Sequence, residues 1–201
     1  MITILDYGLG NLSSIENMIK KAGGTAKITS QHEEILQATK LIIPGVGHFA
    51  RGMENLEKGN FVQLINKKAL EDKVPVLGIC LGAQLLTDHS EEGDANGLGL
   101  IPARTKKFQF PDNKLKVPHM GWSEITFKPH PLFEDAVDSR YYFVHSYFIK
   151  CNDQKNSIAT CNYGHAFDCA IANDNIMGVQ FHPEKSHRFG MQLFRNFIHN
   201  F

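Results

Sequence analysis

The sequence carries no excess of charge and no long apolar run. Lys and Arg together number 21 and Asp and Glu also number 21, so the formal net charge is zero. Without a net charge or a basic cluster, there is no electrostatic reason to propose nucleic acid or an anionic membrane as a partner. No apolar run approaches the roughly 18 residues of a membrane-spanning helix, and the N-terminus lacks the basic and apolar regions of a secretory leader. We therefore expect a soluble, cytoplasmic globular protein.

Motifs for metal binding and for structural disulfides are also missing. The four cysteines, Cys80, Cys151, Cys161 and Cys169, form no C-x-x-C pair and no zinc-type spacing. Cys161 and Cys169 could pair in principle, but small core thiols in a reducing cytosol are the preferred interpretation. The ten histidines show no H-x-x-x-H or H-E-x-x-H spacing. We expect neither a metal site nor a cofactor.

The chain is long enough to bury one sizeable core. Its 201 residues lie at the upper end of the usual range for a single domain. No internal repeat, low-complexity tract or linker interrupts the sequence. We expect one domain over residues 1–201.

Strand-like and helix-like segments alternate through the first part of the chain. The pattern predicts strands at residues 2–7, 25–29, 41–43 and 74–79, and helices after residue 11, at 31–37 and over 49–70. Such alternation favours an α/β fold with a mostly parallel sheet covered by helices on both faces. Residues 8–11, 44–47 and Cys80 all follow strands, and the carboxyl ends of parallel strands share one edge of a sheet. We expect these three positions to converge.

The pattern changes after residue 98. Short β-type runs at 106–110, 124–127, 141–149, 157–160 and 167–172 are separated by Gly, Pro, Asn and Asp, which predicts added antiparallel strands. Residues 176–181 again form a strand. The apolar residues of 186–201 have helical spacing, which predicts a terminal helix packed on the sheet.

Cys80 lies at the junction of a strand and a helix, between Gly78 and Gly82. A nucleophile on so sharp a turn needs small residues two positions to either side, as in the G-x-S-x-G elbow. The turn places the sulfur at a helix N-terminus, where free N–H groups favour a thiolate, and it offers the N–H of Leu81 to a developing oxyanion. The alternative interpretation is a buried core cysteine at a strand end.

His182 and Glu184 follow the strand at 176–181. A residue before proline is extended, so His182 should prolong the strand, and positions two apart in an extended chain project to the same side. His182 would then accept the proton of Cys80, and the Glu184 carboxylate would orient the imidazole. Taken alone, His-Pro-Glu is more often a simple loop after a strand, but the elbow makes the catalytic interpretation the better one.

Residues 78–84 together with His182, Pro183 and Glu184 resemble the class I (triad) glutamine amidotransferases, and the resemblance runs through essentially the whole chain. It implies a flavodoxin-like core and hydrolysis of L-glutamine to glutamate and ammonia through a thioester on Cys80. It also implies a second oxyanion donor in the turn at 44–47, the N–H of Val46. The glycine at Gly47 would let this peptide flip between inactive and active orientations.

The resemblance further implies that Gln84, Glu92 and the backbone of Ser146 and Tyr147 bind glutamine. Glu92 suits the task because the α-ammonium of the substrate needs a counter-charge. The alternatives are a solvated acid at Glu92 and a polar helix-face residue at Gln84. His145 lies in an apolar strand, where a core histidine with its hydrogen bonds satisfied is the preferred interpretation.

Four further motifs, at residues 6–11, 44–47, 118–122 and 142–147, resemble one branch of the family, the glutaminase subunits of imidazole glycerol phosphate synthase. The branch implies a heterodimer with a cyclase subunit of (β/α)8 fold, to which ammonia passes through a channel. Trp122, Tyr142 and Lys185 match positions at the mouth that faces this barrel. Indole groups are over-represented at interface hot spots, although a plain core tryptophan is the alternative for Trp122.

Two departures leave the branch open. Ser123 stands where the branch usually has asparagine, and residues 185–190 resemble a paralogous branch that supplies ammonia to a similar barrel in bacterial surface-sugar biosynthesis. The central motifs fit both branches, and histidine biosynthesis is the preferred interpretation. A catalytically silent binding subunit is a further alternative, against which the intact Cys80, His182 and Glu184 argue.

Overall fold

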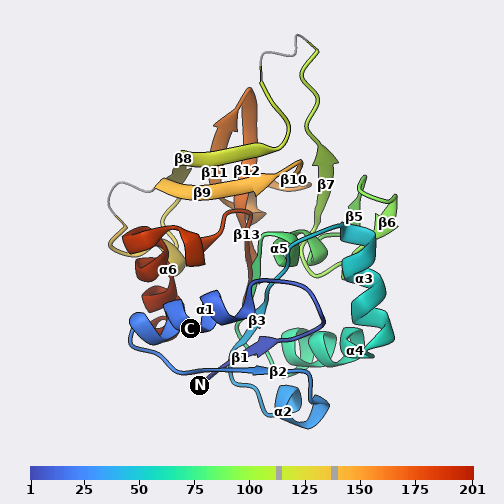
Figure 1. The fold of residues 1–201 in the computed structure, drawn as a ribbon, viewed down its shortest axis with the longest axis vertical. Coiled ribbons are helices and arrows are strands. Elements are labelled where there is room, and N and C mark those ends of the chain that lie inside the picture. Colours follow the sequence, from blue (N-terminus) through green and yellow to red (C-terminus); the bar gives the residue numbers. More distant parts are fainter. Residues whose placement is uncertain (112–114, 137–139) are drawn as a thin grey trace.

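The computed structural model describes residues 1–111, 115–136 and 140–201 and builds them around one mixed sheet (Figure 1). Neighbouring strands follow the order β2-β1-β3-β4-β13-β12-β10-β7-β5-β6. The parallel part contains β2 (Ala26–Thr29), β1 (Ile2–Leu5), β3 (Leu41–Ile43), β4 (Val76–Ile79) and β13 (Ile176–Val179). Antiparallel pairs then add β12 (His165–Asn173), β10 (Tyr147–Cys151) and β7 (Ala103–Lys107). At the edge, the short β5 (His89–Ser90) pairs in parallel with β7, and β6 (Ala95–Asn96) pairs antiparallel with β5. The predicted fold class is confirmed.

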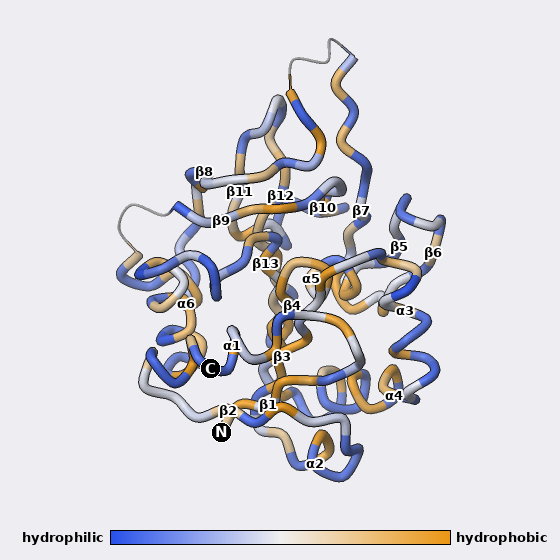
Figure 2. Tube along the Cα trace, in the orientation of Figure 1, coloured by the Kyte–Doolittle hydropathy of each residue, from blue (hydrophilic) through white to orange (hydrophobic). Residues whose placement is uncertain are grey.

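Helices cover both faces of the parallel strands, and each face has its own hydrophobic core. On one face α1 (Leu12–Lys21) and α6 (His187–His199) pack beside each other, and on the other lie α3 (Phe49–Lys58), α4 (Phe61–Asn66) and α5 (Leu81–Leu85). The short α2 (His32–Leu36) joins the second group. Strand side chains alternate between the two cores, so Ile4 and Ile79 meet α1 and α6 while Leu5 and Val76 meet the others. The apolar segments of Figure 2 follow these strands.

The backbone conformation at helix ends explains why the observed helix limits differ from the predicted ones. Gly23 has φ +93°, a conformation that favours glycine, and it follows the last turn of α1. The predicted helical region at 49–70 is interrupted because Asn60, at φ +54°, ends α3 and starts α4. A π-helical turn at Lys67–Glu71 follows α4. Among the described residues, no helix has the length and apolarity to cross a bilayer.

A second group of strands folds over the carboxyl end of the parallel sheet (Figure 1). The strand β11 (Ser157–Tyr163) pairs with both β12 and β8 (His119–Phe127), and β8 pairs with β9 (Arg140–His145). The single run predicted at 141–149 is therefore wrong, because the chain bends at Ser146 into β9 and β10, which have different partners. The buried positions are 141, 143 and 145 in β9, and 148, 149 and 151 in β10.

Candidate active site

Cys80 occupies a strained turn between β4 and α5. Its backbone angles are φ +55° and ψ −110°, and its N–H donates to the carbonyl of Val179 at 2.8 Å. A Cβ added at Gly82 would lie 1.8 Å from the carbonyl oxygen of Ile43, and one at Gly78 would lie 2.7 Å from the amide nitrogen of Ala83. Only glycine fits at either position. The predicted elbow is confirmed as a piece of backbone geometry.

His182 reaches the nucleophile because β13 pairs in parallel with β4, with Gly178 opposite Gly78 and Val179 opposite Ile79. The Nδ1 of His182 lies 2.8 Å from Glu184 Oε1, and both side chains are 1% exposed. The Nε2 of His182 is buried without a hydrogen-bond partner in the described parts of the chain, and Cys80 is a close neighbour of the imidazole. His182 and Glu184, the two candidate catalytic partners of Cys80, are therefore in contact with each other beside the cysteine.

The path from His182 to Glu184 differs from the predicted one. The strand β13 ends at Val179; His182 is extended, with φ −100° and ψ +94°, but Glu184 lies in a 3-10 turn, Pro183–Lys185. The same-side argument for an extended chain is thus wrong, and the turn folds the carboxylate back onto the imidazole. Ser186 secures it, since its Oγ donates to the carbonyl of His182 at 2.6 Å and accepts the N–H of Tyr142 at 3.0 Å. Sequence reasoning missed Ser186.

The electrostatic balance favours a charged imidazole. Burial alone disfavours the imidazolium, but the negative charges of Cys80 and Glu184 outweigh it and raise the pKa of His182 to about 10. The geometry fits a thiolate–imidazolium pair held by a buried carboxylate.

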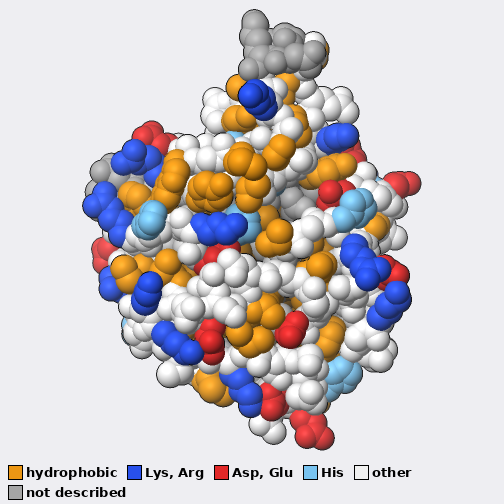
Figure 3. All heavy atoms as spheres, in the orientation of Figure 1, with side chains coloured by type: hydrophobic (Ala, Val, Ile, Leu, Met, Phe, Trp, Pro, Cys, Tyr) orange, Lys and Arg blue, Asp and Glu red, His pale blue; other side chains and the backbone are white. Residues whose placement is uncertain are grey.

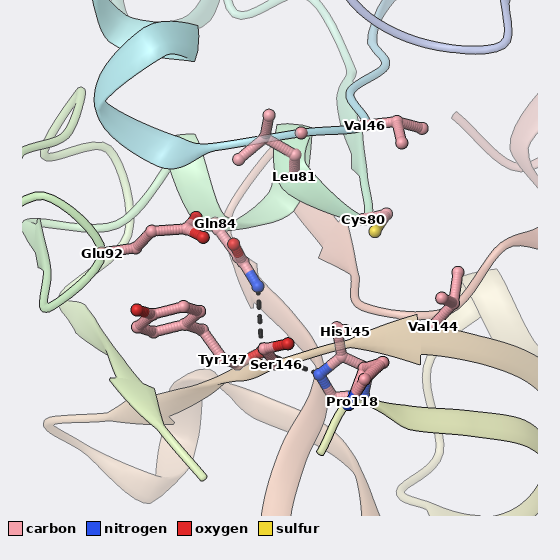
Figure 4. A pocket seen from close by; sticks show the side chains of 11 residues that line it. Val46, Cys80, Leu81, Gln84, Glu92, Pro118, Val144, His145, Ser146 and Tyr147 are labelled. Carbon is pink, nitrogen blue, oxygen red and sulfur yellow. Dashed lines mark hydrogen bonds between the residues drawn. The ribbon is translucent and has the colours of Figure 1, made fainter.

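A cavity of about 220 Å³ opens beside the Cys80 sulfur (Figure 4). It brings together the predicted nucleophile, all three predicted oxyanion-hole residues and all four predicted substrate residues, together with Pro118, Val144 and His145. The full lining is Val46, Gly47, Cys80, Leu81, Gln84, Glu92, Pro118, Val144, His145, Ser146 and Tyr147. In Figure 4, Gln84, Glu92 and Tyr147 lie on the side of the pocket away from Cys80.

Gln84 belongs to a buried network and is not a polar helix-face residue, because it is only 4% exposed. Its Nε2 donates to the carbonyl of Tyr147 at 3.0 Å and to Gln180 Oε1 at 2.9 Å. A backbone carbonyl only accepts, so the Tyr147 contact fixes which amide atom of Gln84 is the donor. Gln180 must then turn its own Nε2 to the Cys80 sulfur, 3.9 Å away. Sequence reasoning missed Gln180, although a polar residue beside an apolar strand end was the available signal.

Glu92 is not a free solvated acid. Its Oε2 accepts the backbone N–H of Phe49, the first residue of α3, at 2.8 Å. Its own N–H donates to Ser90 Oγ at 3.0 Å. Glu92 therefore presents a carboxylate to the pocket from a loop that is tied to the start of α3.

The two predicted oxyanion donors are not both available. The N–H of Leu81 donates to the carbonyl of Gly45 at 3.3 Å, so a carbonyl of the turn faces the position where an oxyanion would form. Tyr7 Oη holds the turn from behind by donating to the carbonyl of Pro44 at 2.6 Å. Gly47 has φ +128°, a conformation that favours glycine, directly after Val46. An oxyanion hole at this place requires the Gly45–Val46 peptide to rotate.

Two buried histidines form a chain of hydrogen bonds behind the pocket. His145 Nδ1 bonds to the carbonyl of Tyr147 at 2.7 Å, His145 Nε2 to His119 Nδ1 at 3.0 Å, and His119 Nε2 to Ser123 Oγ at 2.8 Å. Since the carbonyl only accepts, each imidazole donates from Nδ1 and accepts at Nε2, and Ser123 donates. Burial lowers the pKa of His119 to about 4 and that of His145 to about 3. His145 is the satisfied core histidine that the sequence predicted, and Ser123 completes the chain.

Exposed apolar side chains lie on and near the segments that line the pocket. Trp122 is 45% exposed, and with it Val46, Val117 and Met120 are exposed large apolar residues, so the core interpretation of Trp122 is wrong. Its indole stacks on the ring of His187, with 5.5 Å between centroids and 3° between planes. Figure 3 shows hydrophobic side chains gathered over β8 and β9.

Lys185 and Tyr142, the other two residues predicted at the mouth that faces the barrel, also lie together. The Nζ of Lys185 sits 5.9 Å from the ring centroid of Tyr142. Such a contact places a cation against an aromatic face. Within the described ranges, no group of three or more His, Cys, Asp or Glu side chains is arranged to hold a metal ion.

An elbow cysteine, a buried His–Glu pair just after the adjacent strand and a pocket with a carboxylate on the side away from the cysteine define a class of cysteine-based hydrolase on an α/β sheet. Known proteins agree with this class. The family description "Glutamine amidotransferase class-I" matches residues 3–201. The chain belongs to the class I glutamine amidotransferase family.

Two relatives are similar along almost their whole length. The protein named "Imidazole glycerol phosphate synthase subunit HisH 2" from Methanococcus maripaludis is 53% identical over 200 residues, which cover 98% of each chain. The protein of the same name from Pseudomonas aeruginosa is 46% identical over 200 residues, again 98% of each chain. A crystal structure described as a glutamine amidotransferase matches 96% of this chain and 98% of its own with a TM-score of 0.73. It is only 16% identical, so it supports the fold alone.

Proposed function

We propose that this chain is the glutaminase subunit of an imidazole glycerol phosphate synthase. It hydrolyses L-glutamine to glutamate and ammonia, and the ammonia passes to a cyclase subunit of (β/α)8 fold. The observation that carries the proposal is the pocket in which Cys80 and Glu92 face each other, with room for a short substrate between them. The names of relatives at 53% and 46% identity support the assignment to this synthase.

The residues divide the chemistry as follows. His182 accepts the Cys80 proton, and the thiolate attacks the side-chain amide carbon of glutamine. The imidazolium then gives its proton to the leaving nitrogen, so ammonia departs and a glutamyl thioester remains. His182 next removes a proton from water, which attacks the thioester and releases glutamate with a free Cys80 thiol. Glu184 holds the imidazole in the required tautomer throughout.

At the far end of the substrate, Glu92 supplies the counter-charge for the α-ammonium, and Gln84, Ser146 and Tyr147 line the space around it. The oxyanion is bound by the N–H groups of Leu81 and Val46 once the Gly45–Val46 peptide rotates. The Gly45 carbonyl on Leu81 N–H supports a resting state that is poorly active. The rotation is the step at which a partner can control the glutaminase.

The partner binds the surface that carries Trp122, Tyr142 and Lys185. In the partner subunit, the ammonia reacts with the phosphoribulosyl formimino intermediate PRFAR, giving imidazole glycerol phosphate and aminoimidazole carboxamide ribotide. In this role the chain acts in the cytoplasm as a heterodimer, with residues 1–201 as one glutaminase domain and without a cofactor.

One observation favours a second candidate partner. His187, from the segment that resembles the surface-sugar branch, stacks on Trp122. If this segment sets partner choice, the chain supplies ammonia to the paralogous barrel of that pathway. The glutaminase chemistry is the same in both cases.

The test is glutamate release from glutamine by the purified chain, alone and with the cyclase subunit from the same source, with and without PRFAR. Strong stimulation by cyclase and PRFAR together, abolished in Cys80→Ala, is the expected result. Stimulation only by the paralogous barrel would assign the chain to the surface-sugar branch. No glutamate under any condition would refute the glutaminase assignment.

A further inference from the structure

The loop that carries Glu92 is packed against the start of α3. Besides the 2.8 Å bond from Phe49 N–H to Glu92 Oε2, the next residue, Gly93, has no room for a side chain. A Cβ there would lie 2.7 Å from Ala50 Cβ and 2.9 Å from His48 Cε1. Residues 90–93 and the first turn of α3 therefore form one tight contact.

This contact lies directly beside the oxyanion turn. Phe49 follows Val46 by three residues, and Val46, Gly47 and Glu92 line the same cavity. Before the turn, the chain is held by the Tyr7 hydroxyl on the carbonyl of Pro44. After the turn, Glu92 holds it at Phe49. The segment that must rotate is thus bounded by two side-chain contacts, and one of them is made by a residue that faces the substrate.

We propose that Glu92 is also a positioning residue: through Phe49 N–H it couples recognition of the α-amino group to the orientation of the oxyanion turn. The inference rests on the proposed glutaminase activity. In the described residues only Oε2 of the Glu92 carboxylate has a protein partner, which leaves Oε1 for the substrate ammonium. The Glu92 carboxylate then binds both the substrate ammonium and the N–H of Phe49, which lies three residues after the oxyanion donor Val46. An amide substrate without the α-amino group loses binding and also loses turnover.

The two roles separate with a second substrate, 4-carbamoylbutanoate, which is glutamine without its α-amino group. Kinetics are measured in the complex with the partner that stimulates the wild type. Glu92→Gln keeps an oxygen acceptor for Phe49 N–H but loses the charge, whereas Glu92→Ala loses both. Glu91→Ala is the matched control, because Glu91 accepts the N–H of Lys107 at 2.7 Å from the same loop and does not line the pocket.

We expect Glu92→Ala to lower kcat for 4-carbamoylbutanoate by about tenfold or more, the value of one hydrogen bond to a charged group. Glu92→Gln should keep that kcat within about threefold of wild type while raising KM for glutamine by about tenfold or more. Glu91→Ala should change neither kcat for 4-carbamoylbutanoate nor KM for glutamine. If Glu92→Ala and wild type turn over 4-carbamoylbutanoate with equal kcat, the positioning role is wrong and only ammonium binding remains. Failure of the wild type to hydrolyse glutamine would instead overturn the proposed function.

Amide hydrogen exchange gives a readout that does not depend on turnover. In Cys80→Ala, glutamine should protect the amides of residues 46–49 more strongly than 4-carbamoylbutanoate does, each at saturating concentration. In Cys80→Ala with Glu92→Ala this difference should vanish. Equal protection by both ligands in Cys80→Ala would overturn the coupling.

Discussion

Replacing Cys80 by glycine should leave a more stable protein than replacing it by alanine. At φ +55° and ψ −110°, Cys80 lies outside the left-handed helical well that non-glycine residues tolerate, so any Cβ at this position is strained. Such a conformation costs about 1–3 kcal/mol. Both substitutions remove the sulfur, so their difference isolates the strain of the Cβ.

The magnitude follows from two opposed effects. Glycine relieves about 2 kcal/mol of strain, but it raises the conformational entropy of the unfolded chain, which costs about 0.4–1 kcal/mol. Cys80→Gly should therefore exceed Cys80→Ala by about 1 kcal/mol in free energy of unfolding. For a chain of this length, that difference is about 2–4 °C in Tm.

Urea unfolding of both variants measures the difference, with equal m-values as the condition for comparing midpoints. Ser14 in α1 is the control position, because its backbone is helical and alanine should be more stable there than glycine by about 1 kcal/mol. A reversal of the Ala/Gly order between positions 80 and 14 is the expected result. If alanine is the more stable residue at both positions, the elbow is not strained and the argument fails.

Three further predictions concern other parts of the site. His119 and His145 are neutral in the fold, so their contribution to stability is present above the unfolded pKa of about 6.5 and is lost as pH falls toward folded pKa values of about 4 and 3. Each contributes up to about 2 kcal/mol less at pH 5 than at pH 7, which urea unfolding at the two pH values would measure; a stability that is equal at both would contradict this. Gln180→Leu removes the amide N–H from the Cys80 sulfur and the acceptor from Gln84. It should lower kcat by about tenfold or more with a smaller change in KM, and should slow alkylation of Cys80 by iodoacetamide; an unchanged alkylation rate would exclude a contact with the thiolate. Trp122→Ala should weaken binding of the stimulating barrel by about 2 kcal/mol, or about 30-fold, by titration calorimetry, and unaltered binding would place the interface elsewhere.

The sequence predicted the elements whose causes are local. The elbow was predictable because its two glycines flank Cys80 in one short motif; the clash at Gly78 is with Ala83 in the same turn, although that at Gly82 is with Ile43 of the neighbouring β3. The alternation of strands and helices was predictable because each strand is apolar on both faces and each helix on one. These patterns are carried by short stretches of chain.

Contacts between distant segments could not be predicted in the same way. Whether the Leu81 N–H is free depends on the carbonyl of Gly45, which sequence patterns do not orient. The role of Gln180 depends on a carbonyl at Tyr147, which exists in the pocket because the chain bends at Ser146. The bend interrupts one continuous apolar run, and the alternation pattern of that run does not reveal it.

The position of β13 has a consequence for the time at which activity arises during synthesis. The strand that leads to His182 is placed between β4 and β12, in the middle of the sheet and not at its edge. A nascent chain therefore carries the cysteine long before its base, and the earlier strands cannot close the central sheet without the late one. Under the mechanism that we propose, a chain that stops before His182 lacks the base and should release no ammonia from glutamine.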